Sequence, residues 1–316
     1  MILIKMFAHK KIIITGGAGF LGNYVVKELI KNGVKKDNIF IPRKKHYDLR
    51  RSEDIRKMFN DFPSDIVIHL AASTGGIDFY RKHPGTLFYN NLIMGLELME
   101  QARLNKIEKF VVIGSGVMYP PHAETPLKEE SIWNGYPEGA AAAYGLYNRA
   151  LLAQSQQYRK EFGFESIFLI PANLYGPNDY FEMKRSHIIP AMISKFYSAK
   201  KEGLSKVEVW GSGKAAREFL YVEDAARLIV LATKKYNSPE PLNLGHGTCT
   251  PIREIVKIIS ENVGYDGKIY WNTSMPEGVL KRCYDISKLN EFLGKQKYTS
   301  LEEGIDETIK EYEKTL

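Results

Sequence analysis

The hydrophobic and polar positions in the first half of the chain follow two alternating periods. Short runs rich in apolar and β-branched residues predict strands, and the segments between them have helical spacing. The predicted strands are residues 11–15, 38–42, 66–70, 109–114 and 165–171, and the predicted helices are residues 21–32, 54–59, 85–105 and 143–161. Strands that are apolar throughout suit a sheet covered by helices on both faces. We therefore predict an α/β fold with a doubly wound parallel sheet.

The second half of the chain is less regular. Residues 174–205 and 236–299 carry more proline, glycine and turn signals, whereas a strand is predicted at 207–210 and a helix at 223–235. We predict a larger domain of residues 1–173, rejoined by residues 207–235. Residues 174–206 and 236–316 are expected to form a smaller lobe.

Composition places the chain among ordinary globular proteins. Of its 316 residues, 44% are hydrophobic and 26% are charged. It contains no apolar run of the ~20 residues that a membrane-spanning helix needs, and its N-terminus has no signal-peptide pattern, so we expect a cytoplasmic protein that does not enter a membrane. The net charge of +7 comes from short, scattered basic clusters. We interpret them as a solvated surface that favours phosphate-bearing ligands and not as a nucleic-acid-binding face.

Two cysteines, Cys249 and Cys283, are the only ones in the sequence. Neither has a histidine or a second cysteine at metal-ligand spacing, so we predict no metal site. Two distant cysteines in a protein expected to be cytoplasmic also give no sign of a disulfide. We expect both side chains to be inert or buried.

The strongest local motif lies between the first predicted strand and helix. Glycines at Gly16, Gly19 and Gly22 give the spacing G-x-x-G-x-x-G. Phe20 and Leu21 lie between the last two glycines and are expected to contact the cofactor with them. Without Cβ atoms the backbone can turn tightly and approach a pyrophosphate, which the free N–H groups of the helix N-terminus then bind. At the start of a β-α-β unit this motif predicts a Rossmann-type dinucleotide-binding domain, which we assign to residues 1–173. The smaller lobe is then expected to bind substrate.

The end of the second strand predicts which dinucleotide is bound. NAD-binding proteins place an acidic residue there to accept from the ribose hydroxyls, whereas this chain reads Pro42-Arg43-Lys44-Lys45. Because the cations suit a 2′-phosphate, we predict NADP(H), with Arg43 and Lys44 as contacts. An exposed basic turn is a competing interpretation, above all for Lys45. Asp48 and Leu49 follow and are expected beside the adenine.

Several further strings make the chain similar to a known family. They include His69-Leu70-Ala71-Ala72, Gly114-Ser115-Gly116, Asn173-Leu174-Tyr175-Gly176-Pro177, Ser186-His187-Ile188-Ile189-Pro190, Val209-Trp210-Gly211-Ser212-Gly213 and Arg217-Glu218-Phe219. With the glycine motif and Tyr144, these strings resemble the extended short-chain dehydrogenases/reductases. Within that group the chain resembles most the GDP-L-fucose synthases, which are GDP-4-keto-6-deoxymannose epimerase/reductases.

The resemblance implies a role for each of several residues. Ser115 is expected to hydrogen-bond the substrate carbonyl, and Tyr144 to give a proton when hydride reaches the ketone carbon. His187 is implied as an acid in epimerisation at neighbouring carbons. The remaining positions are implied as cofactor contacts at Ala71, Ala72, Asn91 and Asn148, and as substrate contacts at Asn173, Trp210, Arg217, Lys281 and Arg282.

Two positions depart from the family pattern. The catalytic helix of the family carries Tyr-x-x-x-Lys, but here Asn148 stands four residues after Tyr144. Residues i and i+4 share a helix face, so Asn148 can still hydrogen-bond a ribose, but it supplies no cation to lower the tyrosine pKa. The family also places a cysteine base two residues after the serine, and this chain has Val117 there. Two-centre epimerisation is therefore in doubt.

These observations predict an NADP(H)-dependent reductase or epimerase/reductase of a nucleotide-linked 4-keto sugar, with GDP as the nucleotide. One alternative is a nucleotide-sugar epimerase or dehydratase that retains its nicotinamide cofactor. Another is a catalytically impaired homologue that only binds the sugar nucleotide. Resemblance further implies a homodimer formed through the helix that carries Tyr144 and the long helix before strand four.

Overall fold

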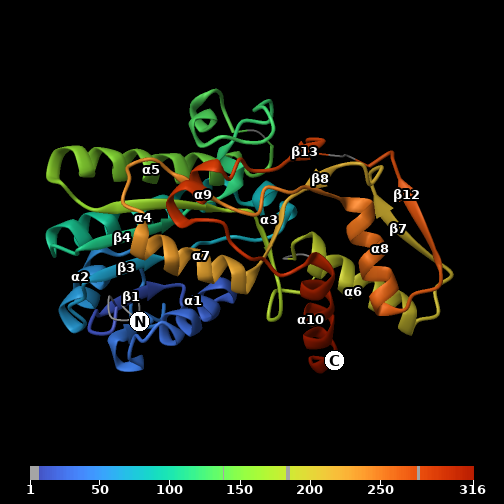
Figure 1. Ribbon diagram of the computed structural model, residues 1–316, viewed down its shortest axis with the longest axis horizontal. Helices are drawn as coiled ribbons and strands as arrows, with labels where there is room; N and C mark the ends of the chain where they lie inside the picture. Colours follow the sequence, from blue (N-terminus) through green and yellow to red (C-terminus); the bar gives the residue numbers. More distant parts are fainter. Residues whose placement is uncertain (1–6, 138, 183–185, 276–277) are drawn as a thin grey trace.

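A six-stranded parallel sheet forms the centre of the larger part of the molecule (Figure 1). The computed structural model describes residues 7–137, 139–182, 186–275 and 278–316. The strand order is β10-β5-β4-β3-β1-β2, and every neighbouring pair is parallel. The strands are β1 (Ile12–Thr15), β2 (Ile39–Phe40), β3 (Ile66–His69), β4 (Lys109–Ile113), β5 (Ser166–Pro171) and β10 (Leu242–Leu244).

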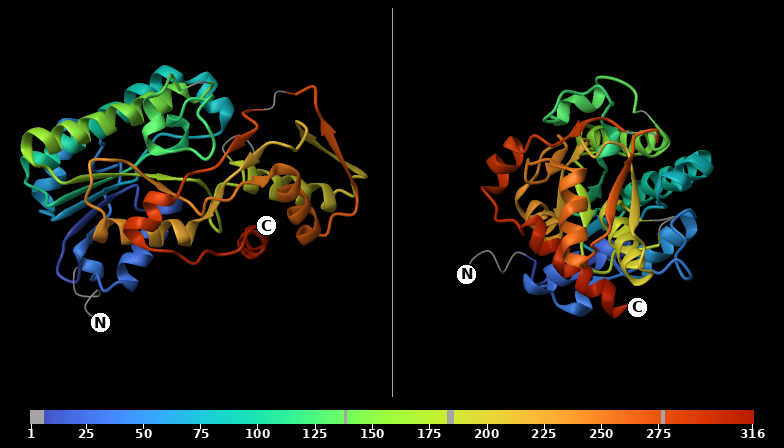
Figure 2. Two further views of the ribbon diagram at one scale, coloured as in Figure 1. Left: turned by 45° about the horizontal axis from the view of Figure 1, so that its top comes forward. Right: turned by 90° about the vertical axis from the view of Figure 1, so that its right-hand side faces the viewer.

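Helices cover both faces of this sheet (Figure 2). On one face α1 (Phe20–Lys31) packs against α7 (Val222–Lys235), and on the other α4 (Pro84–Leu104) packs against α5 (Ala142–Phe162). Helix α2 (Ser52–Asp61) contacts α4, and the short helix α3 (Ile77–Lys82) comes directly before α4 in the sequence. β1, β3 and β5 are buried along their whole length, as expected for strands made mostly of apolar residues. The predicted doubly wound parallel sheet is confirmed.

The smaller lobe, on the right of Figure 1, has its own hydrophobic core. Three helices and a two-stranded sheet enclose it: α6 (Ile188–Lys201), α8 (Ile252–Val263), α10 (Leu301–Lys314), β7 (Lys206–Trp210) and β12 (Lys268–Asn272). Two small sheets lie at its boundary with the large sheet. One pairs β6 (Asn173–Tyr175) with β9 (Phe219–Tyr221), and the other has the order β11 (Thr250–Pro251), β8 (Ala216–Arg217), β13 (Lys281–Arg282). Helix α9 (Ser287–Leu293) packs against α7 and β10.

The segments after residue 173 differ from the sequence-based expectation in three ways. Helix α7 rejoins the large sheet as predicted, but β7 does not, because it pairs with β12 in the smaller lobe. The strand that does join the large sheet is β10, which we had assigned to the lobe. The segments predicted as turn-rich also contain α6 and α8. The apolar residues of α8 do have helical spacing, but the prolines and glycines of the surrounding segment outweighed it in the prediction.

In the first half of the chain the predicted elements agree with the structure to within a few residues at their ends. The helix predicted at 85–105 is α4, and the helix predicted at 143–161 is α5. Gly33 follows the end of α1 with a φ of +90°, as expected for a glycine that terminates a helix. Over the described residues, no helix has both the length and the apolarity to span a bilayer.

Candidate active site

The topological switch point of the large sheet lies at the carboxyl ends of β1 and β3. From β1 the chain moves to β2 on one side and then returns to β3 on the other, which opens a crevice between β1 and β3. Thr15 Oγ1 and His69 Nδ1 are joined there by a hydrogen bond of 2.7 Å. Gly16 follows with a φ of +71°, and a Cβ on it would lie 2.8 Å from the backbone nitrogen of Ala71. Only glycine fits at this position.

The N-terminus of α1 is free to bind an anion. Gly19 is its N-cap, no side chain of the described residues caps it, and its first turn holds no acidic residue. A Cβ on Gly22 would collide with the carbonyl oxygen of Gly16, so the helix and the turn are packed backbone to backbone. These features fit the pyrophosphate of a dinucleotide, since N–H groups at a helix N-terminus carry a partial positive charge.

Asn91 of α4 holds the loop that follows β3. Its Oδ1 accepts from the backbone N–H of Ser73 at 2.6 Å, and its Nδ2 donates to the carbonyl of the same residue at 2.9 Å. The side chain is buried, whereas Ala71 and Ala72 are half-buried beside the glycine turn. Asn91 is therefore placed to fix the shape of this loop.

The basic turn after β2 is exposed. Arg43, Lys44 and Lys45 all lie at the surface, and the turn is closed by backbone bonds from His46 and Tyr47 to the carbonyl of Arg43. No carboxylate stands at the end of β2 to repel a phosphate.

Two residues that were predicted beside the adenine lie just after this turn. Asp48 forms an ion pair with Arg50, and hydrogen bonding from that guanidinium lowers the pKa of Asp48 to about 2. Its carboxylate is therefore already engaged. Leu49 is buried in the core.

Tyr144 lies in the first turn of α5 within a cluster of aromatic rings. Its ring centroid is 4.8 Å from that of Tyr147 and 5.5 Å from that of Tyr80. Burial raises the pKa of Tyr144 well above its usual value, and the neighbouring Tyr147 and Tyr80 raise it further, while a hydrogen bond with Thr74 acts in the opposite direction. The phenol is thus held in its protonated form, which is the form a proton donor needs. Sequence analysis did not single out Tyr80 or Thr74.

Asn148 is fully buried one turn after Tyr144. Its Nδ2 donates to the carbonyl of Tyr144 at 2.8 Å. Its Oδ1 is buried without a hydrogen-bond partner among the described residues. A buried polar atom left unpaired costs free energy, so this oxygen is suited to accept from a bound hydroxyl such as that of a ribose. Both Asn148 and the glycine turn therefore fit a nicotinamide dinucleotide.

The loop after β4 carries Ser115 and packs directly on the first turn of α5. Residues Gly116–Met118 form a short 3₁₀ helix, and the carbonyl oxygen of Val117 lies so close to Gly145 that a Cβ there would be 2.6 Å away. Arg149 holds this loop from beneath, donating from Nε and Nη2 to the carbonyl of Met118 at 2.9 and 2.6 Å.

The sheet β11-β8-β13 brings three of the predicted substrate contacts together. Arg217 of β8 is the register partner of Arg282 in β13, and Lys281 precedes Arg282. Arg282 reaches the serine loop, donating to the carbonyl of Gly116 at 3.2 Å. Nδ2 of Asn173 donates to the carbonyl of Glu218, the residue after Arg217, at 2.8 Å. Cations on adjacent strands beside Ser115 are suited to bind a diphosphate.

Comparison with protein-family models decides the relationship of the chain. Residues 12–245 match the model of the NAD dependent epimerase/dehydratase family. The chain belongs to this family.

Similar proteins within the NAD dependent epimerase/dehydratase family extend over nearly the whole chain. A probable GDP-L-fucose synthase 1 from Oryza sativa subsp. japonica is 32% identical over 96% of this chain and 92% of its own. A solved GDP-6-OMe-4-keto-L-xylo-heptose reductase from C. jejuni is 27% identical, with a TM-score of 0.91 over 98% of this chain and 99% of its own. A GDP-mannoheptose C4 reductase from Campylobacter jejuni, solved with NADP bound, is 27% identical, with a TM-score of 0.88 over the same shares. The predicted resemblance to GDP-L-fucose synthases is confirmed.

The prediction of two unlinked cysteines is wrong. Cys249 and Cys283 form a disulfide with a Cα–Cα distance of 5.5 Å. Cys249 directly precedes β11 and Cys283 directly follows β13, and both strands pair with β8. The pairing depends on this three-stranded sheet, which the sequence did not predict, so a separation of 34 residues gave no signal.

Two other predicted residues, His187 and Trp210, lie in the smaller lobe. His187 is exposed at the N-cap of α6. Trp210 ends β7 and is 60% exposed. Among the described residues, neither has a contact that ties it to Ser115 or Tyr144, so their roles stay predictions.

Asp179 is a buried carboxyl group that sequence analysis did not single out. It lies in the loop between β6 and α6, where its Oδ1 accepts from the N–H of Tyr180 at 2.7 Å. Oδ2 is buried without a hydrogen-bond partner among the described residues, and burial raises the pKa of Asp179 to about 7.

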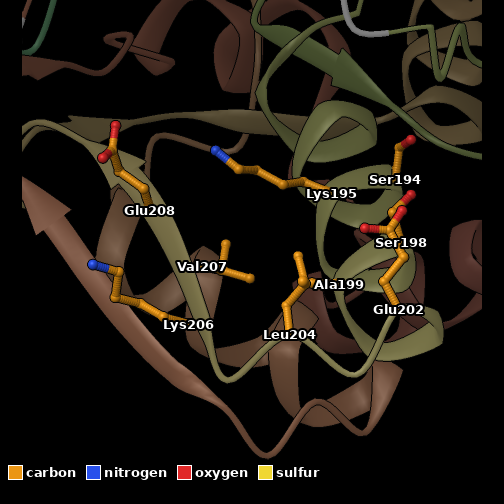
Figure 3. Close-up of a pocket in the computed structure, with 9 residues that line it drawn as sticks. All are labelled: Ser194, Lys195, Ser198, Ala199, Glu202, Leu204, Lys206, Val207 and Glu208. Carbon is orange, nitrogen blue, oxygen red and sulfur yellow. The ribbon is translucent and has the colours of Figure 1, made fainter.

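A cavity of about 360 Å³ lies between α6 and β7 in the smaller lobe (Figure 3). Lys195, Glu202, Lys206 and Glu208 give it a mixed lining of both charges. Burial lowers the pKa of Lys195, and Glu208 opposes this change. None of the predicted site residues lines this cavity, so it is distinct from the site at the sheet edge.

Proposed function

We propose that the chain is an NADP(H)-dependent reductase of a GDP-linked 4-keto sugar. The observation that carries the proposal is the junction of α5 with the serine loop. It puts Tyr144 and Ser115 on packed segments at the same edge of the sheet as the glycine turn. Similar proteins named GDP-L-fucose synthase and GDP-heptose reductase, some solved with NADP or NADPH bound, support the substrate class and the cofactor.

The residues of the chain divide the work of this reaction. Hydride for the ketone carbon would come from NADPH when it is bound. Tyr144, kept protonated by burial, gives its proton to the ketone oxygen, and Ser115 hydrogen-bonds that oxygen. Asn148 accepts from the nicotinamide ribose, and Arg217 with Arg282 binds the diphosphate. Arg43 and Lys44 bind the 2′-phosphate.

Reduction without epimerisation is the form of the reaction that the serine loop favours. Val117 occupies the position of the base that the resemblance implies, and an alkyl side chain cannot remove a proton. Two of the similar structures are named as reductases. His187 is then a substrate contact rather than one of a pair of acid and base groups.

Asn148 supports a second candidate. Without a lysine at position 148 the chain lacks the cation that would make the phenol of Tyr144 a stronger acid. The Nδ2 of Asn148 already donates to the carbonyl of Tyr144. A catalytically impaired protein that binds GDP-sugars fits these two facts. An epimerase or dehydratase with a retained cofactor stays as a third reading, which predicts cofactor that co-purifies with the protein.

Further proposals concern the assembly of the chain and its place in the cell. Exposed Tyr89 and Leu104 on α4, with Phe162 on α5, support a homodimer through these two helices. We also propose a cytoplasmic location, where NADPH and nucleotide sugars are made. We keep the division into a cofactor-binding part of residues 1–173 and a substrate-binding lobe as a proposal, with β10 and α7 added to the former.

Oxidation of NADPH with a panel of GDP-linked 4-keto hexoses and heptoses tests the proposed function. We expect turnover with at least one substrate, and Tyr144→Phe should lower it by about 10²- to 10⁴-fold because it removes the proton donor. NADPH affinity should be unchanged. Tyr158→Phe, on the same helix but outside the cluster, is the matched control. Unchanged turnover in Tyr144→Phe, or no oxidation with any substrate, would contradict the proposal.

A further inference from the structure

The disulfide closes the small sheet that carries the candidate phosphate-binding cations. In this sheet Arg217 is paired in register with Thr250 on one side and with Arg282 on the other. Cys249 lies one residue before Thr250 and Cys283 one residue after Arg282. The bridge therefore joins the two outer strands next to both neighbours of Arg217.

Glu218 ties the same two segments together by a second, non-covalent route. Its Oε1 accepts from the backbone N–H groups of His246 and Gly247 at 2.6 and 2.8 Å. Its Oε2 accepts from the N–H of Tyr284 at 2.8 Å. Because these bonds do not depend on the cysteines, we expect the segments to stay folded when the disulfide is reduced, but with more freedom.

The residues next to Cys283 contact the loop after β4 that carries Ser115. Tyr284 follows Cys283, and its hydroxyl contacts Gly116 so closely that a Cβ there would collide with it. The same hydroxyl donates to the carbonyl of Pro171 at 3.1 Å, and Arg282 donates to the carbonyl of Gly116 at 3.2 Å. The residues on both sides of Cys283 thus hold the loop of Ser115 in place.

We propose that Cys249 and Cys283 form a redox modification site that sets the affinity of the enzyme for the diphosphate of its substrate. The inference rests on the proposed function for the identity of the substrate. In the disulfide form the sheet is pre-organised, so less ordering is needed when Arg217 and Arg282 bind the diphosphate. In the dithiol form that ordering accompanies binding and weakens it. Cytoplasmic disulfides that are not permanent are typically redox-sensing.

Thiol–disulfide exchange with a small-molecule disulfide, such as glutathione disulfide, makes the bond with balanced chemistry. Cys249 is only half-buried, whereas Cys283 is buried, so the thiolate of Cys249 attacks first and releases one small thiol. The thiolate of Cys283 then attacks the mixed disulfide and releases the second. Two protein thiols are oxidised, and one small disulfide is reduced to two thiols. A small dithiol reverses both steps.

Binding of GDP to the two forms tests the inference without depending on turnover. The full chain is prepared with glutathione disulfide or with dithiothreitol, its free thiols are counted, and GDP is titrated calorimetrically. We expect no free thiols and two free thiols respectively, and a Kd for GDP about three- to tenfold lower in the oxidised form. In turnover assays KM for the ketosugar should change by a similar factor, and kcat should change less.

The double variant Cys249→Ser/Cys283→Ser is the matched control, because a single variant would keep one thiol that forms a mixed disulfide with glutathione. The double variant should bind GDP like the reduced wild-type chain under either treatment. Equal GDP affinities of the oxidised and reduced wild-type chain would overturn the inference, as would thiols that do not disappear and return as a pair. A shift in thermal stability without a change in Kd for GDP would also overturn it, because it assigns the bridge a structural role alone. Failure of the proposed function appears separately, as absence of NADPH oxidation in both forms.

Discussion

The glycine turn after β1 and the first turns of α5 lie at the same edge of the sheet but are built differently. In the turn, backbone packs on backbone, and the absent Cβ atoms of Gly16 and Gly22 define its shape. At the start of α5 side chains define the site: the rings of Tyr80 and Tyr147 lie beside the reacting phenol, and the amide oxygen of Asn148 has no hydrogen-bond partner among the described residues. The glycine turn tolerates almost no substitution, whereas at the start of α5 the exchange of a single side chain can change the chemistry of the site. This difference explains why the cofactor motif is intact while Asn148 and Val117 depart from the family pattern.

Of the substitutions that compare these two regions, Asn148→Lys should have the largest effect. In Asn148→Lys a cation one turn from Tyr144 lowers the pKa of the phenol and makes it a stronger acid. We expect turnover to rise by about tenfold to a thousandfold, which corresponds to roughly one to three pKa units. The measurement is kcat for NADPH oxidation with the best ketosugar, and Asn148→Met is the uncharged control of similar length.

The pH profile of the same pair of proteins gives a second reading of this change. A proton donor is active below its pKa, and the pKa of Tyr144 is raised by burial. Wild-type turnover should therefore show no alkaline decline caused by Tyr144 within the range where the protein is stable. The decline should move to lower pH in Asn148→Lys. If kcat and the profile are the same in both proteins, Tyr144 is not the proton donor.

Substitution in the glycine turn should change NADPH affinity rather than turnover. In Gly22→Ala the new Cβ meets the carbonyl of Gly16, so α1 and the turn must separate. Overpacking of this kind costs about 1–3 kcal/mol, which corresponds to a loss of NADPH affinity of roughly ten- to a hundredfold. Gly85→Ala is the control, since a Cβ there meets nothing within 4 Å. Calorimetric titration and a thermal melt of both variants check the result; equal affinities would show that the turn is not the phosphate site.

The smallest effect is expected at the exposed basic turn. In Arg43→Ala one solvated cation is lost, so NADPH affinity should fall by about three- to tenfold, while NADH affinity should not change. Lys36→Ala, an exposed cation just before β2, controls for general charge. A parallel loss for NADPH and NADH in Arg43→Ala would instead mean that Arg43 does not recognise the 2′-phosphate.

The same contrast explains how much the sequence could predict. The glycine spacing and the apolar strands are local patterns, and they correctly predicted the strands β1 to β5 and the position of α5, whereas the sixth strand of the sheet, β10, was missed. The contacts of Tyr80 and Thr74 with Tyr144 were not predicted, because both residues follow β3 and are far from Tyr144 in the sequence. The disulfide and the hydrogen bonds of Glu218 were not predicted for the same reason, since the residues that form them come together only when β8, β11 and β13 pair.

The central claim is reduction at the ketone carbon without epimerisation of its neighbours. The most direct test is turnover of GDP-4-keto-6-deoxymannose with NADPH in D₂O, followed by NMR of the product and a count of NADPH consumed. We predict one NADPH oxidised per product and no deuterium on the carbons next to the former ketone, compared with a sample without enzyme. Deuterium on those carbons, or product formed without oxidation of NADPH, would contradict the account.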